Sequence, residues 1–397
     1  MISVKEAKNF VLNSVPTTIC KSIHLDEALG YYLAGEILAP VDLPNFNNSA
    51  MDGYGMCFSE ILKGVRKFRL VTEIKAGDTL SEAITEDTTC SIYTGAIVPP
   101  SVDVIIPIEH TNAEGGFVEI LDYTITQHQH IRRQGEQIKQ GEIALQKGHL
   151  INAASIGFLA ALGISELTVF SKPKIAIITT GNELVEIGNS LQTGQIFNSN
   201  KHSLKALVKS SDIDQCELFH TEDTYEGTYT VFKNALINFD IIISTGGVSV
   251  GKYDLVNDVL TDLGVKKQFH KVNQKPGKPI YFGCKDSKLV FGLPGNPAAV
   301  ITTFYQYVLP AIKKWCGNPL PFLETEKAIL AHDIKVKGTR TKFLKAIVTN
   351  KNVTILEGQG SHILQSMALS NCIVEIQPEE MELEKGTEVL IHKLPNV

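Results

Sequence analysis

The chain has 397 residues and is 43% hydrophobic, with 37 basic residues, 43 acidic residues and a net charge of -6. This length predicts roughly two to four domains, because single cores stop growing at about 250–300 residues. The absence of a long basic stripe argues against nucleic acid as the principal partner. We expect neither a signal peptide nor a membrane span, because Lys and Glu interrupt the first residues and no run of about 18 apolar residues occurs.

The seven cysteines are scattered along the chain and form no C-x-x-C pair. This usage is typical of reduced core thiols and not of a disulfide framework or a zinc knuckle. We therefore expect a cytoplasmic protein.

The first part of the chain is predicted to combine short helices with a β-rich lobe. Residues 4–13 and 26–33 carry helical apolar spacing, and a loop rich in Pro, Asn and Gly follows at residues 41–55. From about residue 54 to residue 145, short β-type runs are separated by turn residues, which predicts a small β-rich lobe. A helix and then a strand are expected within residues 149–170.

The remainder of the chain is predicted to contain an α/β domain and a β domain. From residue 174 to about residue 316, strand patterns alternate with helix patterns. Such alternation predicts right-handed βαβ units, and therefore a doubly wound parallel sheet with helices on both faces. Beyond Pro319 the pattern is all β and predicts a small barrel or sheet. The fold class is thus multi-domain α/β plus β.

Three glycine-bearing turns follow buried-strand patterns: TTGNELVEIG (179–188), STGGVSVGKYD (244–254) and GLPGNPAAV (292–300). Glycine lets backbone N–H groups approach an anion, and a helix starting beyond the turn adds positive dipole. Ligands of such sheets bind at the carboxyl ends of the strands. We therefore predict a phosphate or oxyanion site with these candidate contacts: Gly181, Gly246, Gly247, Ser249, Gly251, Pro294, Gly295 and Asn296.

The segment from Gly246 to Lys252 matches most of the phosphate-binding pattern GxxxxGK. However, Tyr253 stands where a Ser or Thr hydroxyl would hold Mg²⁺, which disfavours a nucleoside-triphosphatase loop. A phosphate or pterin contact and a purely structural tight turn both remain open.

Three acidic residues, Glu183, Asp223 and Asp254, each follow a predicted strand. If they converge, they suit a divalent cation that bridges phosphates, and Glu183 alone could act as a base or accept a sugar hydroxyl. The structural alternatives are a solvated loop residue for Glu183, a helix N-cap for Asp223 and a helix-dipole partner for Asp254.

The KPGKP turn at residues 275–279 places Lys275 and Lys278 three residues apart on a backbone stiffened by two prolines. Fixed cations of this kind suit an oxyanion, although loop lysines often only solvate the surface. Further anion donors are Arg340, Ser361 and His362.

The histidines of the sequence HQH, His128 and His130, would lie on one face if this segment is a strand. They suggest a metal site, for which the sequence supplies no third ligand nearby.

The loop PNFNNSAMDGYG (44–55) is followed in order by YTGAIVPP, TTGNELVEIG, GQIFNSN, STGGVSVGKYD, QKPGKP and GLPGNPAAV. Together these motifs resemble the MoeA family of molybdopterin molybdenumtransferases over essentially the whole chain. The same scheme occurs in the E domain of gephyrin. The most unusual of these signatures are SAMDGY and GLPGNP.

The resemblance implies a cytoplasmic homodimer that completes the molybdenum cofactor. It would insert molybdate into adenylated molybdopterin and hydrolyse the pyrophosphate link, releasing AMP, with Mg²⁺ or another divalent ion assisting. The implied protein partners are the upstream adenylyltransferase and molybdoenzyme chaperones, with neither nucleic acid nor membrane involved.

The resemblance also implies four domains. Residues 1–53 and 146–173 would form an elongated domain, residues 54–145 an inserted β-rich lobe, residues 174–318 the α/β molybdopterin-binding domain and residues 319–397 a β-barrel.

Matched by position, Asp52 of SAMDGY and Thr94 of YTGA correspond to functional residues of the family, with Asp52 acting across the dimer. The three acids Glu183, Asp223 and Asp254 match positions associated with the nucleotide, the metal and hydrolysis. The family positions implied to hold molybdate are Lys275, Lys278, Arg340 and Ser361.

Two positions depart from the family pattern. Gln137 and Lys252 both stand where acidic residues are common. The preference between molybdate and tungstate and the identity of the divalent ion therefore remain open.

Two other functions are compatible with the resemblance. One is a gephyrin-like dimeric interaction scaffold, and the retained acids Asp52, Glu183 and Asp254 argue against it. The other is a molybdopterin adenylyltransferase, which shares the α/β domain. The additional N-terminal and barrel segments argue against that function.

Overall fold

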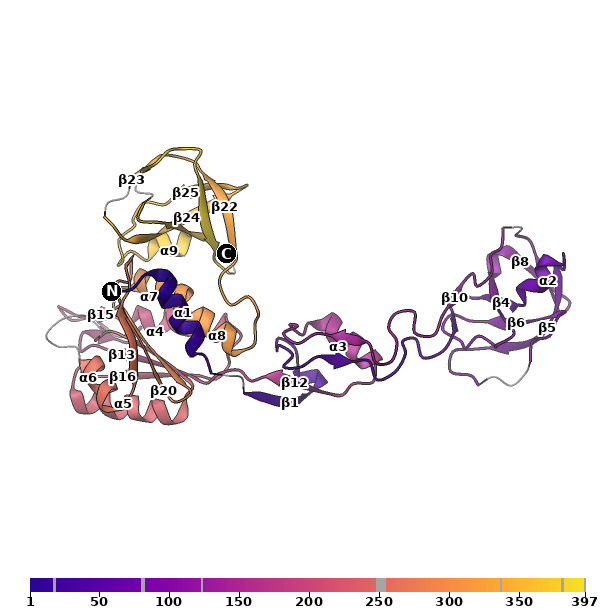
Figure 1. Cartoon of the computed structure of the whole chain (residues 1–397), viewed down its shortest axis with the longest axis horizontal. Coiled ribbons are helices and arrows are strands. Elements are labelled where there is room, and N and C mark those ends of the chain that lie inside the picture. The colour runs from indigo at the N-terminus through magenta and orange to yellow at the C-terminus, as the bar shows by residue number, and fades with distance from the viewer. Residues whose placement is uncertain are drawn as a thin grey trace. The chain divides into compact units, whose positions relative to one another are not determined.

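A computed structural model describes residues 1–16, 19–79, 83–122, 124–247, 255–335, 338–379 and 382–395 (Figure 1). The chain divides into two compact units. Unit 1 comprises Met1–Lys21, Gly30–Ala34 and Thr168–Val397, and unit 2 comprises Ser22–Leu29 and Gly35–Leu167. Every helix within the described residues is too short or too polar to cross a membrane.

Unit 2 contains a six-stranded sheet in the order β7-β4-β6-β5-β9-β8. Its strands are β4 (Gly53–Met56), β5 (Lys67–Ile74), β6 (Thr88–Ile92), β7 (Val104–Pro107), β8 (Thr111–Glu114) and β9 (Phe117–Ile120). All neighbours are antiparallel except β5 and β6, which are parallel. The β-type runs predicted for this stretch are therefore confirmed.

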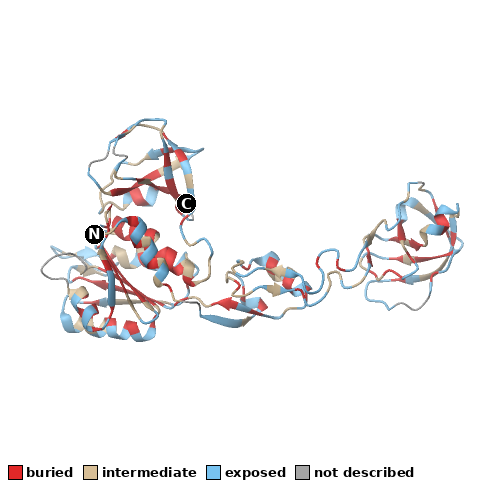
Figure 2. Ribbon diagram, in the orientation of Figure 1, coloured by how far each residue is buried: buried red, intermediate tan, exposed pale blue. Residues whose placement is uncertain are grey.

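Strand β7 of unit 2 contributes to cores on both faces of the sheet, because alternate residues of a strand point to opposite sides. In β7, Val104 and Ile106 pack with Phe68 in one core, and Ile105 packs with Ile92 in another. Helix α2 (Phe58–Leu62) contributes to the first core. Figure 2 shows the buried residues of these strands in red.

The remainder of unit 2 is built from short pairings and one helix. Strand β2 (Ile37–Leu38) pairs with β11 (Ile143–Leu145), and β3 (Asn48–Ser49) pairs with β10 (Ile131–Arg132). The predicted helix near residue 153 is confirmed as α3 (Ala153–Ala161), with Asn152 in a capping box.

The helix predicted over residues 26–33 is wrong. The structure has only a 3₁₀ turn, η1 (Leu25–Glu27). Gly30 has a φ of +78°, in the left-handed region, which an α-helix does not continue through. Leu33 then forms a β-bridge with Val169.

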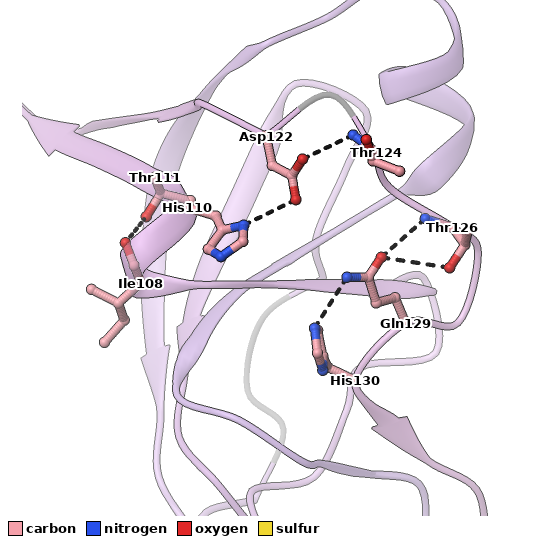
Figure 3. Close-up of polar contacts among 8 residues, drawn as sticks. All are labelled: Ile108, His110, Thr111, Asp122, Thr124, Thr126, Gln129 and His130. Atoms are coloured by element: carbon pink, nitrogen blue, oxygen red, sulfur yellow. Dashed lines mark hydrogen bonds and ion pairs between the residues drawn. The ribbon is translucent and has the colours of Figure 1, made fainter.

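The segment around His128 and His130 is not a strand, so the condition for the two histidines to share one face is not met. Both residues lie in a turn with positive φ values, 64° and 60°. Figure 3 shows His130 beside Gln129, whose side-chain oxygen accepts a hydrogen bond from the Thr126 N–H, while the separate His110 contacts Asp122. Side-chain hydrogen bonds within the turn compete with a strand.

Unit 1 contains a second six-stranded sheet, in the order β16-β13-β17-β21-β20-β18. Its strands are β13 (Ile175–Thr180), β16 (Cys216–Thr221), β17 (Ile241–Thr245), β18 (Lys266–Lys271), β20 (Pro279–Lys285) and β21 (Lys288–Leu293). The first four in spatial order are parallel, as predicted.

The prediction of a wholly parallel sheet needs correction, because β20 and β18 are antiparallel to their neighbours. Only Asp286 and Ser287 connect β20 to β21. A two-residue connection forms a hairpin, since a parallel pair requires a crossover of about a dozen residues. The φ of 52° at Asp286 fits such a turn. The sheet is thus mixed.

Helices cover both faces of this sheet, as predicted. On β13, Ile175 and Ile177 join a core with α4 (Ser199–Lys209), α7 (Pro297–Thr303), α8 (Leu309–Trp315) and the N-terminal α1 (Val4–Ser14). The alternate residues Ala176 and Ile178 join a second core with α5 (Tyr225–Asn238) and α6 (Leu255–Asp262). A π-helical turn, η3 (Phe304–Val308), connects α7 to α8.

The last part of unit 1 is a closed β-barrel, which confirms that prediction. The strand order is β19-β24-β25-β22-β28-β26, and a further pairing of β24 with β26 closes the sheet. Its strands are β19 (Gln274–Lys275), β22 (Thr325–Leu330), β24 (Thr341–Thr349), β25 (Asn352–Ile355), β26 (Cys372–Ile376) and β28 (Glu388–Lys393). The short β19 lies between β18 and β20 in the chain, so this pairing joins the α/β segment to the barrel.

Short paired strands complete the fold. The strand predicted after α3 is confirmed as β12 (Glu166–Phe170); it pairs with β1 (Cys20–His24), and the boundary between the two units falls within both strands. Two further pairs are β14 (Leu184–Val185) with β15 (Ile196–Phe197) and β23 (Ile334–Lys335) with β27 (Glu382–Leu383). A short helix, α9 (Gln365–Leu369), follows the loop after β25.

Candidate functional site

Two of the predicted acids lie at the carboxyl ends of adjacent parallel strands. Glu183 follows β13, Asp223 follows β16, and both side chains are exposed. The two turns are joined, because the Asn182 Oδ1 accepts a hydrogen bond from the Asp223 N–H at 3.3 Å. The N-cap of α5 is Thr224 and not Asp223, which leaves the Asp223 carboxylate available at this edge.

The glycine turn after β17 lies against the end of β13. Added Cβ atoms at Gly246 and Gly247 would lie 2.8 and 3.1 Å from the Thr180 Oγ1. Thr180 is 4% exposed, and its hydroxyl has no hydrogen-bond partner in the part of the chain that the structure describes. At this edge of the sheet, the glycine backbone therefore packs closely against β13, beside a buried hydroxyl group that could donate a hydrogen bond to a ligand.

Asn200 links two of the strand ends. Its Nδ2 donates to the Thr245 Oγ1 at 3.2 Å and to the Gly295 carbonyl at 2.8 Å. The Thr245 hydroxyl in turn donates to the Pro294 carbonyl at 2.9 Å. The GLPGNP turn is thus fixed beside the carboxyl end of β17.

The KPGKP turn is anchored by a buried polar pair. Gln274, fully buried, donates from its Nε2 to the Pro276 carbonyl at 3.0 Å, and its Oε1 accepts from the Tyr307 hydroxyl. Gly277 has a φ of +82°, and a Cβ there would collide with Thr303. Lys275 and Lys278 are exposed from this fixed backbone.

The loop of residues 358–363, here the Ser361 loop, connects the barrel to the α/β segment. The Asn296 Nδ2 donates to the Ser361 Oγ at 2.9 Å, and the Ala298 N–H donates to the Ser361 carbonyl at 3.0 Å. Asn296 is the N-cap of α7. Ser361 therefore lies at the start of the helix that follows the GLPGNP turn.

Lys345 of β24 stabilises the Ser361 loop through hydrogen bonds. Its ammonium group donates to the carbonyls of Gly358, Gly360 and Ile363, at 2.7, 3.1 and 3.0 Å. Lys345 is 4% exposed, and burial lowers the pKa of its ammonium group. All three donors of the ammonium group are thus used to shape one loop.

The remaining predicted cation, Arg340, lies beside β19. Its Nη1 donates to the Gln274 carbonyl at 3.4 Å, one residue before Lys275. Strands β19 and β24 pair in parallel with Lys275 opposite Lys342. The structure therefore brings Lys275 and Arg340 together, together with the unpredicted Lys342.

A second group of predicted residues lies in unit 2. The Asp52 Oδ1 accepts from the Thr94 backbone N–H at 2.7 Å and from the Thr94 hydroxyl at 2.8 Å. These two hydrogen bonds, the backbone one first, lower the pKa of Asp52 below its ordinary value. The two residues thus form one ionised, exposed unit.

Gly53, the residue after Asp52, lies too close to β7 to carry a side chain. A Cβ on Gly53 would collide with the carbonyl oxygen of Ile106 on the adjacent β7. The Ile108 N–H also donates to the Asp52 carbonyl at 3.2 Å. Close packing of β4 against β7 therefore fixes the position of Asp52.

No group of three or more His, Cys, Asp or Glu side chains within the described residues is arranged to hold a metal ion. This includes His128 and His130. The predicted residues Ser249, Gly251 and Asp254 lie outside the described residues.

Three family models match successive parts of this chain. The MoeA N-terminal region (domain I and II) matches residues 2–163, a probable molybdopterin binding domain matches residues 176–314, and the MoeA C-terminal region (domain IV) matches residues 327–394. A molybdopterin molybdenumtransferase of Staphylococcus epidermidis is 35% identical over 362 residues, 89% of this chain and 86% of the relative. The chain belongs to the MoeA family.

Other MoeA relatives agree in sequence and in structure. A molybdopterin molybdenumtransferase of Haemophilus influenzae is 32% identical over 403 residues and covers 98% of both chains. The crystal structure of a molybdopterin biosynthesis MoeA protein from Pyrococcus horikoshii superposes with a TM-score of 0.85 at 26% identity, covering 99% of both chains. The resemblance seen in the sequence is confirmed, and the fold is MoeA-like.

Sequence reasoning missed several residues that hold the candidate site in place. Asn182, Asn200 and Lys345 form its supporting hydrogen bonds, and Lys342 adds a cation. The segment TKFLKAIV offered a signal, because lysines are costly at buried strand positions unless their ammonium groups are engaged. The pairing of Asp52 with Thr94 carried no such signal, since the two residues are 42 positions apart.

Proposed function

We propose that this MoeA-family chain is a molybdopterin molybdenumtransferase, which inserts molybdate into adenylated molybdopterin and releases AMP and the molybdenum cofactor. The observation that carries the proposal is the hydrogen bond between Asn296 and Ser361, which joins the GLPGNP turn to the Ser361 loop. Relatives with this activity in their names support it.

The oxyanion would bind between the KPGKP turn and the barrel. Molybdate is a compact dianion and requires several fixed donors. Lys275 and Arg340 lie at the β19–β24 pairing, and Ser361 offers a hydroxyl from a loop held by Lys345. We assign Lys278, exposed at the far end of the same turn, to the same oxyanion.

Glu183 and Asp223 would hold the divalent cation, with Asp254 as the third acid. The residues present fit Mg²⁺, because two exposed carboxylates follow adjacent parallel strands, and the turns that carry them are joined by the hydrogen bond from the Asp223 N–H to the Asn182 Oδ1. When bound, the cation would screen the charge of the phosphoanhydride. The chain itself would orient the phosphates through the glycine turns at Gly181, Gly246 and Gly247, with the Thr180 hydroxyl as an additional donor.

We also propose a homodimer in which the Asp52–Thr94 unit acts on the site of the partner subunit. The low pKa of Asp52 keeps its carboxylate ionised, as needed to orient a water or a substrate hydroxyl. The scattered cysteines support a cytoplasmic location. The upstream adenylyltransferase and molybdoenzyme chaperones are the proposed protein partners.

Product analysis tests the function. The purified protein is incubated with adenylated molybdopterin and Mg²⁺, with and without molybdate. The expected result is release of AMP and formation of the cofactor only when molybdate is present. A second reaction contains molybdopterin and ATP in place of the adenylated substrate, and consumption of ATP there would instead identify an adenylyltransferase. Adenylated molybdopterin that stays intact under all oxyanions would favour a scaffold.

A further inference from the structure

The side chain of Lys342 is buried beside two other basic residues, Lys275 and Arg340. Its Cα is paired with that of Lys275 across β19 and β24. Neighbouring strands are about 4.8 Å apart, and paired residues of a parallel ladder project to the same face. Lys342 is nevertheless only 5% exposed.

Arg340 adds a third positive charge to this face. It lies in a bend directly before β24, and its Nη1 donates to the carbonyl of Gln274, the residue before Lys275, at 3.4 Å. Burial first, and then the charges of Lys275 and Arg340, lower the pKa of Lys342. The three cations therefore repel one another, and a bound anion would offset that repulsion.

Lys275 and Lys342 both line a cavity of about 560 Å³, here the barrel cavity. Gln359 and Gly360, which lead into Ser361, form another part of its wall. Phe343, Leu344 and Ile334 contribute apolar surface. Apolar walls strengthen the attraction between the two ammonium groups and an anion, because they lower the local dielectric.

The other titratable groups of the barrel cavity are His332, Asp333, Lys335 and Glu357. Asp333 accepts a hydrogen bond from the Lys385 N–H at 2.7 Å, and Lys335 forms an ion pair with Glu382. Glu357 is exposed.

We propose that Lys342 is a further oxyanion-binding residue, which extends the oxyanion site of Lys275, Arg340 and Ser361 into the barrel cavity. The ligand is a tetrahedral dianion, either free molybdate or a phosphate group of the pterin substrate. This inference rests on the proposed function for the identity of the oxyanion, but the binding itself is independent of turnover.

The test measures binding of molybdate alone to the full-length protein by calorimetry, with inorganic phosphate as a second probe. Lys342→Met is expected to weaken oxyanion binding by about tenfold or more, the usual loss for a hydrogen bond to a charged group. Lys342→Arg keeps the charge and is expected to stay within a few-fold of the wild type. The matched control is Lys327→Met, which removes a lysine of the same barrel that does not line the cavity.

Thermal unfolding separates binding from folding. Lys342→Met is expected to show a cooperative unfolding transition without oxyanion, as a folded protein does, and to gain less stability than the wild type when molybdate is added. Equal oxyanion affinity of Lys342→Met and the wild type would overturn the proposal, as would the absence of any oxyanion binding to the wild type at millimolar concentration.

The two probes identify the ligand. Binding of molybdate that depends on Lys342 assigns the residue to the metal donor, and binding of phosphate alone assigns it to the substrate. If Lys342-dependent binding occurs without molybdenum transfer, the oxyanion site stands and the proposed function fails.

Discussion

At the residue scale, two hydrogen bonds from Thr94 control the ionisation of Asp52. Because its folded pKa is lowered, the contribution of Asp52 to stability is present above its unfolded pKa and is lost as pH falls through the folded value. Thr94→Val removes the hydroxyl donor but keeps the backbone donor. We expect the pKa of Asp52, followed by NMR titration, to rise part of the way to its ordinary value, and activity to fall.

Thr94→Ser is the matched control, since it keeps the hydroxyl and is expected to keep the low pKa. An Asp52 that titrates alike in Thr94→Val and the wild type would show that the side-chain hydrogen bond is not formed in solution.

At the element scale, close packing of β4 against β7 requires glycine at position 53. A Cβ there would collide with the Ile106 carbonyl, so Gly53→Ala must displace one strand. Overpacking of this kind costs about 1–3 kcal/mol, and we expect chemical denaturation to show that loss in the free energy of unfolding. Gly157→Ala in α3 is the control, because its Cβ meets nothing within 4 Å and alanine favours a helix. Equal stability of both variants would contradict this packing.

The Ser361 loop gives a second prediction at the element scale. Lys345→Met removes the ammonium donor from the carbonyls of Gly358, Gly360 and Ile363, and the Ser366 hydroxyl and the Ile363 N–H still donate to the first two. A hydrogen bond to a charged group contributes about 1.5–3 kcal/mol, so we expect lower stability and faster amide hydrogen exchange in this loop. Lys345→Arg should restore part of the protection. Unchanged exchange in Lys345→Met would show that the loop is held by other contacts.

At the scale of the whole molecule, we expect a dimer whose site uses residues of both subunits. Asp52→Ala and Glu183→Ala chains are each expected to be inactive. Mixed dimers are expected to recover about a quarter to half of the activity, if each dimer contains one intact composite site. Two different affinity tags, one on each chain and used in succession for purification, establish that the mixed species has formed. Mixed dimers that remain inactive would argue for a site confined to one subunit.

Much of this architecture was predictable because its signals are local. Alternating patterns predicted β13, α4, β16, α5 and β17, and motif glycines marked the strand ends. The antiparallel hairpin of β20 and β21 was missed, because two short apolar runs also fit a parallel sheet. The Lys275–Lys342 pair and the Asn296–Ser361 bond were out of reach, since both depend on how the barrel packs on the α/β segment.

The most direct test of the account is molybdate-dependent AMP release from adenylated molybdopterin, compared between the wild type, Glu183→Gln and Glu186→Gln. Glu186 lies three residues beyond Glu183 and pairs with Lys201 at 2.6 Å, so it is a matched control for the removal of charge. We predict molybdate-dependent release by the wild type and Glu186→Gln, and a loss of at least about a hundredfold in a folded Glu183→Gln. Release that is independent of molybdate, or equal in all three proteins, would contradict the account.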